Sequence, residues 1–147
     1  MKIVLQRVKK ASVEIGGEVF CQIGQGVCLL VGVEKGDSLD EVNRMANKIV
    51  DLRIFPDAQG KMNLSLLDKG GRILAVSQFT LAASTTKGRR PSFDRAEEPQ
   101  CAQRIFESLV QKMNERGLEV KKGVFGALMD VRLINDGPVT FILSSTR

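Results

Sequence analysis

The stretch GVCLLVGV at residues 26–33 decides the fold class, because it is apolar along its whole length. A short, uninterrupted apolar run is typical of a strand that is buried on both faces of a sheet. The stretch RILAVSQFTL at 72–81 has the same character until it reaches its polar and aromatic end, and it predicts a second buried strand. Further strands are predicted at 2–8, 11–15, 18–23, 117–123, 127–135 and 139–145.

Two segments have the period of a helix. The first begins at Ser38, which forms a capping box with Glu41. Its apolar residues fall on one face: Leu39, Val42, Ala46 and Ile49. The second begins near Pro99 and ends at Gly117. Its apolar stripe contains Ala102, Ile105, Phe106, Leu109, Val110 and Met113. Because strands outnumber these two helices, the pattern predicts an α+β domain with largely antiparallel, strongly curved sheets rather than a doubly wound parallel sheet.

Composition restricts the possible functions. With 147 residues, 43% hydrophobic residues and a mean hydropathy near zero, we expect one soluble, globular domain over residues 1–147. No apolar stretch is long enough to cross a bilayer, and the alternating residues 1–15 do not resemble a signal peptide. The net charge of +5 permits a polyanionic partner without requiring one. The chain has no histidine, which excludes Ser-His-Asp, Cys-His and His-metal chemistry.

Neither a cofactor nor a metal is expected. The three cysteines are odd in number and lack CxxC spacing, so buried reduced thiols are favoured over disulfides or a zinc site. The glycines of GQGVCLLVG lead into a strand, whereas nucleotide-binding glycine loops lead into a helix. The sequence therefore predicts chemistry by carboxylates, hydroxyls, amides, basic side chains, backbone groups or the substrate itself.

Three other segments could carry function. SQFTL at 77–81 is either a strand end that satisfies a turn or the rim of a site, where backbone N–H groups and the Gln78 amide stabilise an oxyanion. TTKGRRPSFDR at 85–95 is either a solvated basic loop or a loop that contacts phosphates. Phe125 and Met129 are either core residues or the walls of a flat slot for a base.

NDGPVT at 135–140 separates two apolar runs. Asp-Gly in this position favours a hairpin turn, because glycine accepts the positive φ of a tight turn. A turn does not explain Pro138, which removes a backbone donor where the returning strand would begin to pair.

Taken together, these segments resemble the bacterial type of D-aminoacyl-tRNA deacylase over essentially the whole chain. The two motifs that characterise the family are SQFTL and NDGPVTF, in that order and about sixty residues apart. Other matching stretches are QRV at 6–8 with ASV at 11–13, VGVEKGD, RIFPDAQGKMNLS, VSQFTLAA and RPSF at 90–93.

The resemblance implies a cytoplasmic homodimer with a curved, barrel-like β-sheet, two main helices packed outside and active sites at the dimer interface. It also implies hydrolysis of the ester that joins a D-amino acid to the terminal adenosine at the acceptor end of tRNA. Glycyl-tRNA is an expected further substrate, because glycine is achiral. No membrane partner is implied.

The resemblance also assigns roles to residues. Ser77, Gln78, Phe79 and Thr80 are expected to line the pocket around the scissile ester. Gly137 and Pro138 are expected to be joined by a cis peptide bond and to enter the partner subunit's pocket, where they exclude an L side chain. Further expected roles are the holding of this loop by Arg7 and the sandwiching of adenine by Phe125 and Met129.

Catalysis has two alternatives in this family, the Thr80 hydroxyl or the 2′-hydroxyl of the substrate ribose. Thr80 has no histidine to deprotonate it, so we favour assistance by the substrate. At the level of function, one alternative is a non-catalytic RNA- or nucleotide-binding dimer of the same fold. Another is a small-molecule esterase or amidase without an RNA partner.

Overall fold

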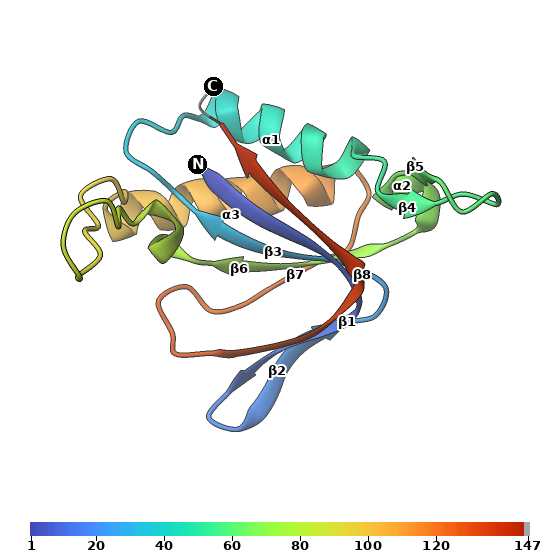
Figure 1. The fold of residues 1–147 in the computed structure, drawn as a ribbon, viewed down its shortest axis with the longest axis horizontal. Helices are drawn as coiled ribbons and strands as arrows, with labels where there is room; N and C mark the ends of the chain where they lie inside the picture. Colours follow the sequence, from blue (N-terminus) through green and yellow to red (C-terminus); the bar gives the residue numbers. More distant parts are fainter. Residues whose placement is uncertain (146–147) are drawn as a thin grey trace.

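Strands β1 (Lys2–Ile15) and β8 (Asp130–Ser144) lie antiparallel and form the spine of the sheet in the computed structural model, which describes residues 1–145 (Figure 1). Within this part of the chain the main sheet has six strands in the order β2–β1–β3–β6–β7, with β8 paired to β1. The other strands are β2 (Glu18–Ile23), β3 (Gly26–Gly32), β6 (Arg72–Ser77) and β7 (Val120–Lys122).

The sheet curves because β1 pairs with β3 through its first half and with β2 through its second half. Figure 1 shows β2 and the adjoining parts of β1 and β8 folded back beneath β3, β6 and β7. β2 also lies close to β6 and β7, so the sheet is nearly closed. This confirms the predicted curved, barrel-like α+β fold of one domain.

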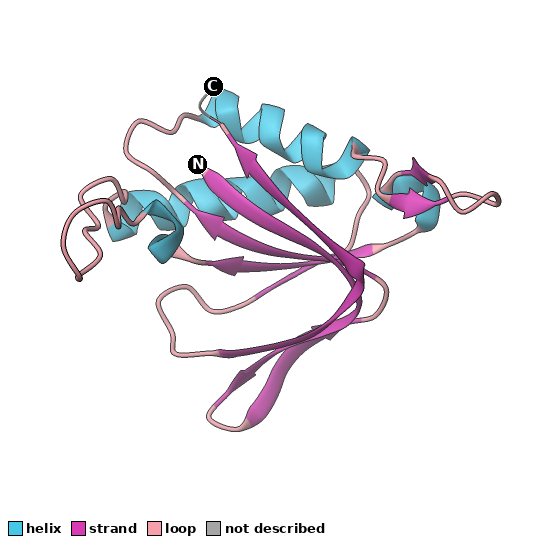
Figure 2. Ribbon diagram, viewed as in Figure 1, coloured by secondary structure: helices cyan, strands magenta, loops and turns pink. Residues whose placement is uncertain are grey.

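The pairing is mixed. β1 is antiparallel to β2, β3 and β8, as predicted, whereas β3, β6 and β7 are parallel to one another. Parallel neighbours require crossover connections, which are usually helical and right-handed. Here α1 (Leu39–Asp51) lies between β3 and β6, and α3 (Pro99–Glu115) lies between β6 and β7. Two crossovers of one hand in one direction put both helices on the same face of the sheet, as Figure 2 shows.

Local signals set the helix boundaries. The Ser38 hydroxyl accepts from the Glu41 N–H, and the Glu41 carboxylate accepts from the Ser38 N–H, so the predicted capping box is confirmed. Gly117, with φ of +89°, follows the end of α3. All six residues of the α3 stripe are buried. Leu39 begins α1 and shares the apolar face of this helix by its spacing, but it is 62% exposed, and the buried stripe of α1 begins at Val42.

Two hydrophobic cores lie on opposite faces of β3. The helix-side core packs Val27, Leu29 and Val31 against α1 and α3, whereas the inner core, inside the curl of the sheet, contains Cys28. Successive side chains of a strand point to opposite faces, so β3 is buried on both sides, as its apolar run predicted. The inner core also contains Val8, Ala11, Val13, Ile23, Leu74 and Val76.

The hairpin predicted at 135–140 is wrong, since β8 continues through this segment. Gln6 pairs with Thr140 and Val8 pairs with Asn135, so four residues of β8 lie opposite Arg7 alone. This bulge removes the local ladder bond, so the missing N–H of Pro138 leaves no gap in the pairing. The Gly137–Pro138 peptide bond is cis, as the resemblance implied.

Smaller elements lie at the two ends of the sheet. The hairpin of β4 (Phe55–Pro56) and β5 (Met62–Leu64) precedes α2 (Leu66–Lys69), and the 3-10 helix η1 (Phe79–Ala82) follows β6. Figure 1 shows the β4–β5 hairpin at one end and the loop between β6 and α3 at the other. Among residues 1–145, no helix is long and apolar enough to cross a membrane.

Candidate active site

The candidate site begins where β6 ends and the chain turns into η1. Ser77 is still paired with Val31 of β3, and the Gln78 N–H donates to the Val31 carbonyl at 2.7 Å. The next residues, Phe79 and Thr80, open the 3-10 helix. The first N–H groups of a helix have no partner within it, so these two donors are available at the strand end. Two adjacent donors of this kind can stabilise an oxyanion.

The side chains of this turn are linked to each other. The Gln78 amide donates to the Thr80 hydroxyl, which is exposed. Within residues 1–145 the Thr80 hydroxyl makes no hydrogen bond with a carboxylate or an amine, and the chain contains no histidine. The arrangement therefore orients Thr80 without providing a base that would activate it.

A hollow of about 520 Å³ opens beside this turn. Its walls come from the end of β6, from Glu97 just before α3 with Pro99 and Ala102 in the first turn of α3, and from the segment between β7 and β8. The hollow brings together five of the nine predicted site residues: Ser77, Gln78, Phe79, Phe125 and Met129. Thr80 is next to this group in sequence but does not line the hollow.

Phe125 and Met129 belong both to the core and to the hollow. The Phe125 ring packs against the Phe106 ring of α3, with centroids 6.4 Å apart, and Met129 packs against the inner core. A Cβ on Gly123 would lie 2.7 Å from the Met129 sulfur, so the absence of a side chain at residue 123 lets Met129 lie close to the backbone here. Both side chains are half-buried, which leaves one side of each facing the hollow.

One aromatic contact of the site was not predicted. The Phe93 ring lies 5.1 Å from the Phe79 ring, centroid to centroid, at 55°. Both rings are partly exposed, at 38% and 57%. Phe93 lies in the RPSF stretch, which matches the family and has basic neighbours, and this match is the signal that could have indicated the contact.

Arg7 holds the bulge of β8. Its guanidinium donates to the Asp136 carbonyl at 3.0 Å and to the Ile54 carbonyl at 2.6 Å, and it lies 3.4 Å from the Asp136 carboxylate. The Arg7 side chain is 10% exposed, whereas Gly137 and Pro138 are exposed. Arg7 therefore contacts the residue that precedes Gly137, and its holding role stays a prediction.

A second bond crosses the bulge, from the Val139 N–H to the Asn135 side-chain oxygen at 2.9 Å. Gly137 has φ of +146°, and a Cβ there would lie 2.6 Å from the Val139 side chain. Asn135, Val139 and Ile54 are contacts of the site that the sequence did not identify, since two of them act through backbone groups.

The bulge and the β6 end are far apart in one chain. Arg7 is level with Val27 of β3 and Ile73 of β6. Ser77 lies four residues further along β6, which is roughly 13 Å, and three strand spacings from β8 to β6 add roughly 14 Å across the sheet. Within one chain the structure therefore does not bring Gly137, Pro138 and Arg7 to the hollow.

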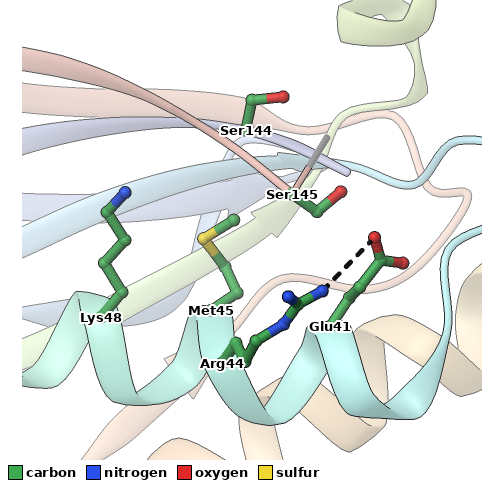
Figure 3. Close-up of a pocket in the computed structure, with 6 residues that line it drawn as sticks. All are labelled: Glu41, Arg44, Met45, Lys48, Ser144 and Ser145. Carbon is green, nitrogen blue, oxygen red and sulfur yellow. Dashed lines mark ion pairs between the residues drawn. The ribbon is translucent and has the colours of Figure 1, made fainter. Parts of the chain in front are cut away.

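Another hollow, of about 200 Å³, lies between α1 and the end of β8 (Figure 3). It is lined by polar residues and Met45, with Arg44 3.8 Å from Glu41, and it contains none of the predicted site residues.

Within residues 1–145, no group of His, Cys, Asp and Glu could hold a metal ion. Burial raises the pKa of the Cys28 thiol to about 12, so this inner-core cysteine stays protonated.

Comparison with known proteins indicates the family of this chain. A family described as D-Tyr-tRNA(Tyr) deacylase matches residues 4–144. A D-aminoacyl-tRNA deacylase of Brevibacillus brevis is 54% identical over 145 residues, covering 99% of this chain and 100% of that protein. One of Aquifex aeolicus is 51% identical, covering 99% and 98%.

Two solved structures are also similar. One is named c-Myc DNA Unwinding Element Binding Protein, with a TM-score of 0.94, 42% identity and complete coverage of both chains. The other, a probable eukaryotic D-amino acid tRNA deacylase, has a TM-score of 0.83, 16% identity and 97% coverage of each chain, and it supports the fold alone. Fold, motifs and matches define a hydrolase of the deacylase class. The chain belongs to the D-Tyr-tRNA(Tyr) deacylase family.

Proposed function

We propose that this chain hydrolyses the ester between a D-amino acid and the terminal adenosine of tRNA, and releases free tRNA and the D-amino acid. The observation that carries the proposal is the hollow at the end of β6, where a family-specific motif meets Phe125 and Met129. Relatives at about half identity over the full chain carry the name D-aminoacyl-tRNA deacylase, which supports the same reaction.

In this proposal the hollow holds the terminal nucleoside and the ester. Phe125 and Met129 flank the adenine, since an aromatic ring and a polarizable thioether pack well against a flat base. The ester carbonyl points to the N–H groups of Phe79 and Thr80. These donors stabilise the charge on the carbonyl oxygen as it develops, and Ser77 and Gln78 complete the polar wall.

Water is the proposed nucleophile. It attacks the carbonyl carbon while the neighbouring 2′-hydroxyl of the ribose accepts a proton from the water and gives its own proton to the 3′-oxygen. The bond from the carbonyl carbon to the 3′-oxygen then breaks, which leaves the 3′-hydroxyl on the ribose and the carboxyl group on the amino acid. The absence of histidine and the lack of a base at Thr80 support this substrate-assisted step over covalent catalysis by Thr80.

Chirality is read by backbone. Gly137 and Pro138 are exposed at a bulge that is held from behind by Arg7. A rigid backbone wall rejects a side chain that points toward it and leaves the opposite configuration free, which suits a whole class of D-amino acids. Glycine has no side chain to reject, so glycyl-tRNA is included among the proposed substrates.

The separation of the bulge from the hollow supports a homodimer. If both act on one substrate, a second copy must supply the bulge, and a two-fold axis would then form two equivalent sites at the interface. We also propose a cytoplasmic location for the protein, which agrees with a tRNA substrate.

The direct test uses D-tyrosyl-tRNA and L-tyrosyl-tRNA with the purified full chain. We expect the D ester to be lost rapidly and the L ester to be lost at its spontaneous rate. Loss of neither ester would favour a non-catalytic nucleic-acid-binding protein, the class that the name of one solved relative describes. Equal loss of both would favour an esterase without chiral selection.

A further inference from the structure

The loop between η1 and α3 rises from the rim of the hollow. Figure 1 shows it beyond the end of β6 and beside the first turn of α3. Its neck is closed by two backbone bonds between Ser84 and Ser92, at 2.8 and 2.9 Å. Gly88, with φ of +72°, allows the chain to turn at the tip. The loop is therefore anchored at its base.

The base of the loop is joined to the proposed catalytic turn. Phe93 follows the neck directly and packs on Phe79. Beyond it, the Lys35 N–H donates to the Arg95 carbonyl at 2.9 Å, and the Glu97 N–H donates to the Val33 carbonyl at 3.1 Å. These bonds tie the returning chain to the end of β3, so the position of the loop relative to the ester site is set.

Four basic residues lie along this segment, and they differ in their partners. Arg95 lies 3.4 Å from the buried Glu34 carboxylate, so its charge already has a partner within the chain. Lys87, Arg89 and Arg90 are exposed, and none of them forms an ion pair with any residue of 1–145. The loop also contains three acidic residues, all of them away from the tip: Asp94 accepts from the Ser92 hydroxyl at the neck, and Glu97 and Glu98 lie directly before α3.

We propose that Lys87, Arg89 and Arg90 bind the phosphate backbone of the tRNA acceptor end, next to the terminal adenosine in the hollow. This inference rests on the proposed function and names the surface that the rest of the tRNA contacts. Unpaired cations on an anchored loop neutralise phosphates without reading bases, which suits an enzyme that accepts many tRNAs. A solvated loop of no function would leave both salt dependence and tRNA affinity unchanged when these charges are removed.

The test compares two double variants that remove the same charge. Arg89→Gln with Arg90→Gln alters the loop, and Arg44→Gln with Lys48→Gln alters exposed positions on α1. Arg44 is 70% exposed at 3.8 Å from Glu41, so the control loses little stability. Each protein is assayed on D-tyrosyl-tRNA and on D-tyrosyl-adenosine, which carries the ester and the base without phosphates.

For the loop variant we expect kcat/KM on D-tyrosyl-tRNA to fall roughly tenfold at low salt, mainly through KM, because two phosphate contacts are lost. The slope of log kcat/KM against log salt should flatten by about 1.5. Activity on D-tyrosyl-adenosine should not change, and the α1 control should match the wild type on both substrates.

Equal losses on both substrates, or equal losses in the two variants, would overturn the proposal. A wild type inactive on both substrates would instead contradict the proposed function. In that case the role of the loop is tested separately, by the binding of uncharged tRNA to the wild type, the loop variant and the α1 control. Weaker and less salt-dependent binding by the loop variant alone would support the proposed phosphate contacts. Equal binding by all three proteins would overturn them.

Discussion

The end of β6 and the bulge of β8 are built in different ways. At the β6 end, main-chain pairing with β3 sets the geometry, and the functional groups are the N–H donors that the start of a helix leaves free. At the bulge, ladder pairing is interrupted, and one buried side chain, Arg7, holds the chain through two carbonyls. The β6 end should therefore tolerate side-chain changes that keep the backbone donors, whereas the bulge should depend on a single residue.

Replacing Arg7 should have the largest effect. Arg7→Ala leaves the carbonyls of Asp136 and Ile54 without their donor and Asp136 without its counter-charge. Removing one partner of a fully buried charged pair costs about 3–5 kcal/mol, and Asp136 is only half-buried, so urea unfolding should show a loss near the lower end of that range, about 3 kcal/mol. Selectivity for D over L esters should fall in parallel, because the bulge is no longer held.

The matched control is Arg132→Ala on β8, the strand that carries the bulge. Arg132 is 71% exposed and lies 2.8 Å from Glu14, so its loss should change stability by about 0.5 kcal/mol or less. Similar effects of the two substitutions would contradict the special role of Arg7.

Removing a backbone donor at the β6 end should come next. Phe79→Pro deletes one N–H at the first position of η1, where proline is tolerated, and Gln78 before it, with φ of −142° and ψ of 79°, lies outside the helical region that a following proline disfavours. Loss of one oxyanion donor lowers kcat by about a hundred- to a thousand-fold. Phe79→Ala keeps the N–H and loses the same ring, so it serves as the control. Equal kcat for the two variants, with folding intact, would exclude this N–H from catalysis.

High pH should lower the stability of the whole sheet through Cys28 of β3, the strand that lies between β1 and β6. Cys28 pairs with Gln6 and with Leu74, and its pKa is about 12 in the native state against an ordinary value of 9.0. Stability from this group is complete below pH 9 and is lost as pH rises toward 12, because the unfolded chain then releases the proton and the folded chain does not.

The expected loss is about 1.4 kcal/mol per pH unit, or roughly 3 kcal/mol at pH 11. Urea unfolding at pH 8 to 11 measures it, with Cys28→Ala as the variant in which the extra slope disappears. Cys101→Ala should keep the slope. The same slope in Cys28→Ala as in the wild type would contradict the assignment to Cys28.

The smallest effect is expected for Thr80→Ala. The Thr80 hydroxyl has the Gln78 amide as its partner and no base, while its backbone N–H survives the substitution. We expect kcat on D-tyrosyl-tRNA to stay within about tenfold of the wild type. A collapse to the spontaneous rate, with tRNA binding retained, would make Thr80 the catalyst.

The sequence predicted the fold class well where one local pattern dominated. The apolar run at 26–33 predicted a strand buried on both faces, and the capping box at Ser38 predicted the start of α1. It predicted β8 poorly, because Asp-Gly favours a turn locally and the continued pairing with β1 depends on residues more than a hundred positions away.

For the site, the family motifs identified the residues, and Ser77 to Phe79 with Phe125 and Met129 do share one hollow. The contacts that complete it could not be read from residue types. Ile54 acts through its carbonyl, and Phe93 reaches Phe79 through the folding of a long loop. The distance between hollow and bulge follows from strand register, which short sequence patterns do not encode.

The central claim is that one chain supplies the ester site and its partner supplies the bulge. The most direct measurement is the activity of a heterodimer made of one Arg7→Ala chain and one Phe79→Pro chain, co-expressed with different tags and purified through both. If the halves combine across a two-fold interface, one of the two sites is intact, and the heterodimer should deacylate D-tyrosyl-tRNA at about half the wild-type rate with wild-type selectivity over L-tyrosyl-tRNA. A heterodimer whose selectivity is as low as that of the Arg7→Ala homodimer would contradict the claim.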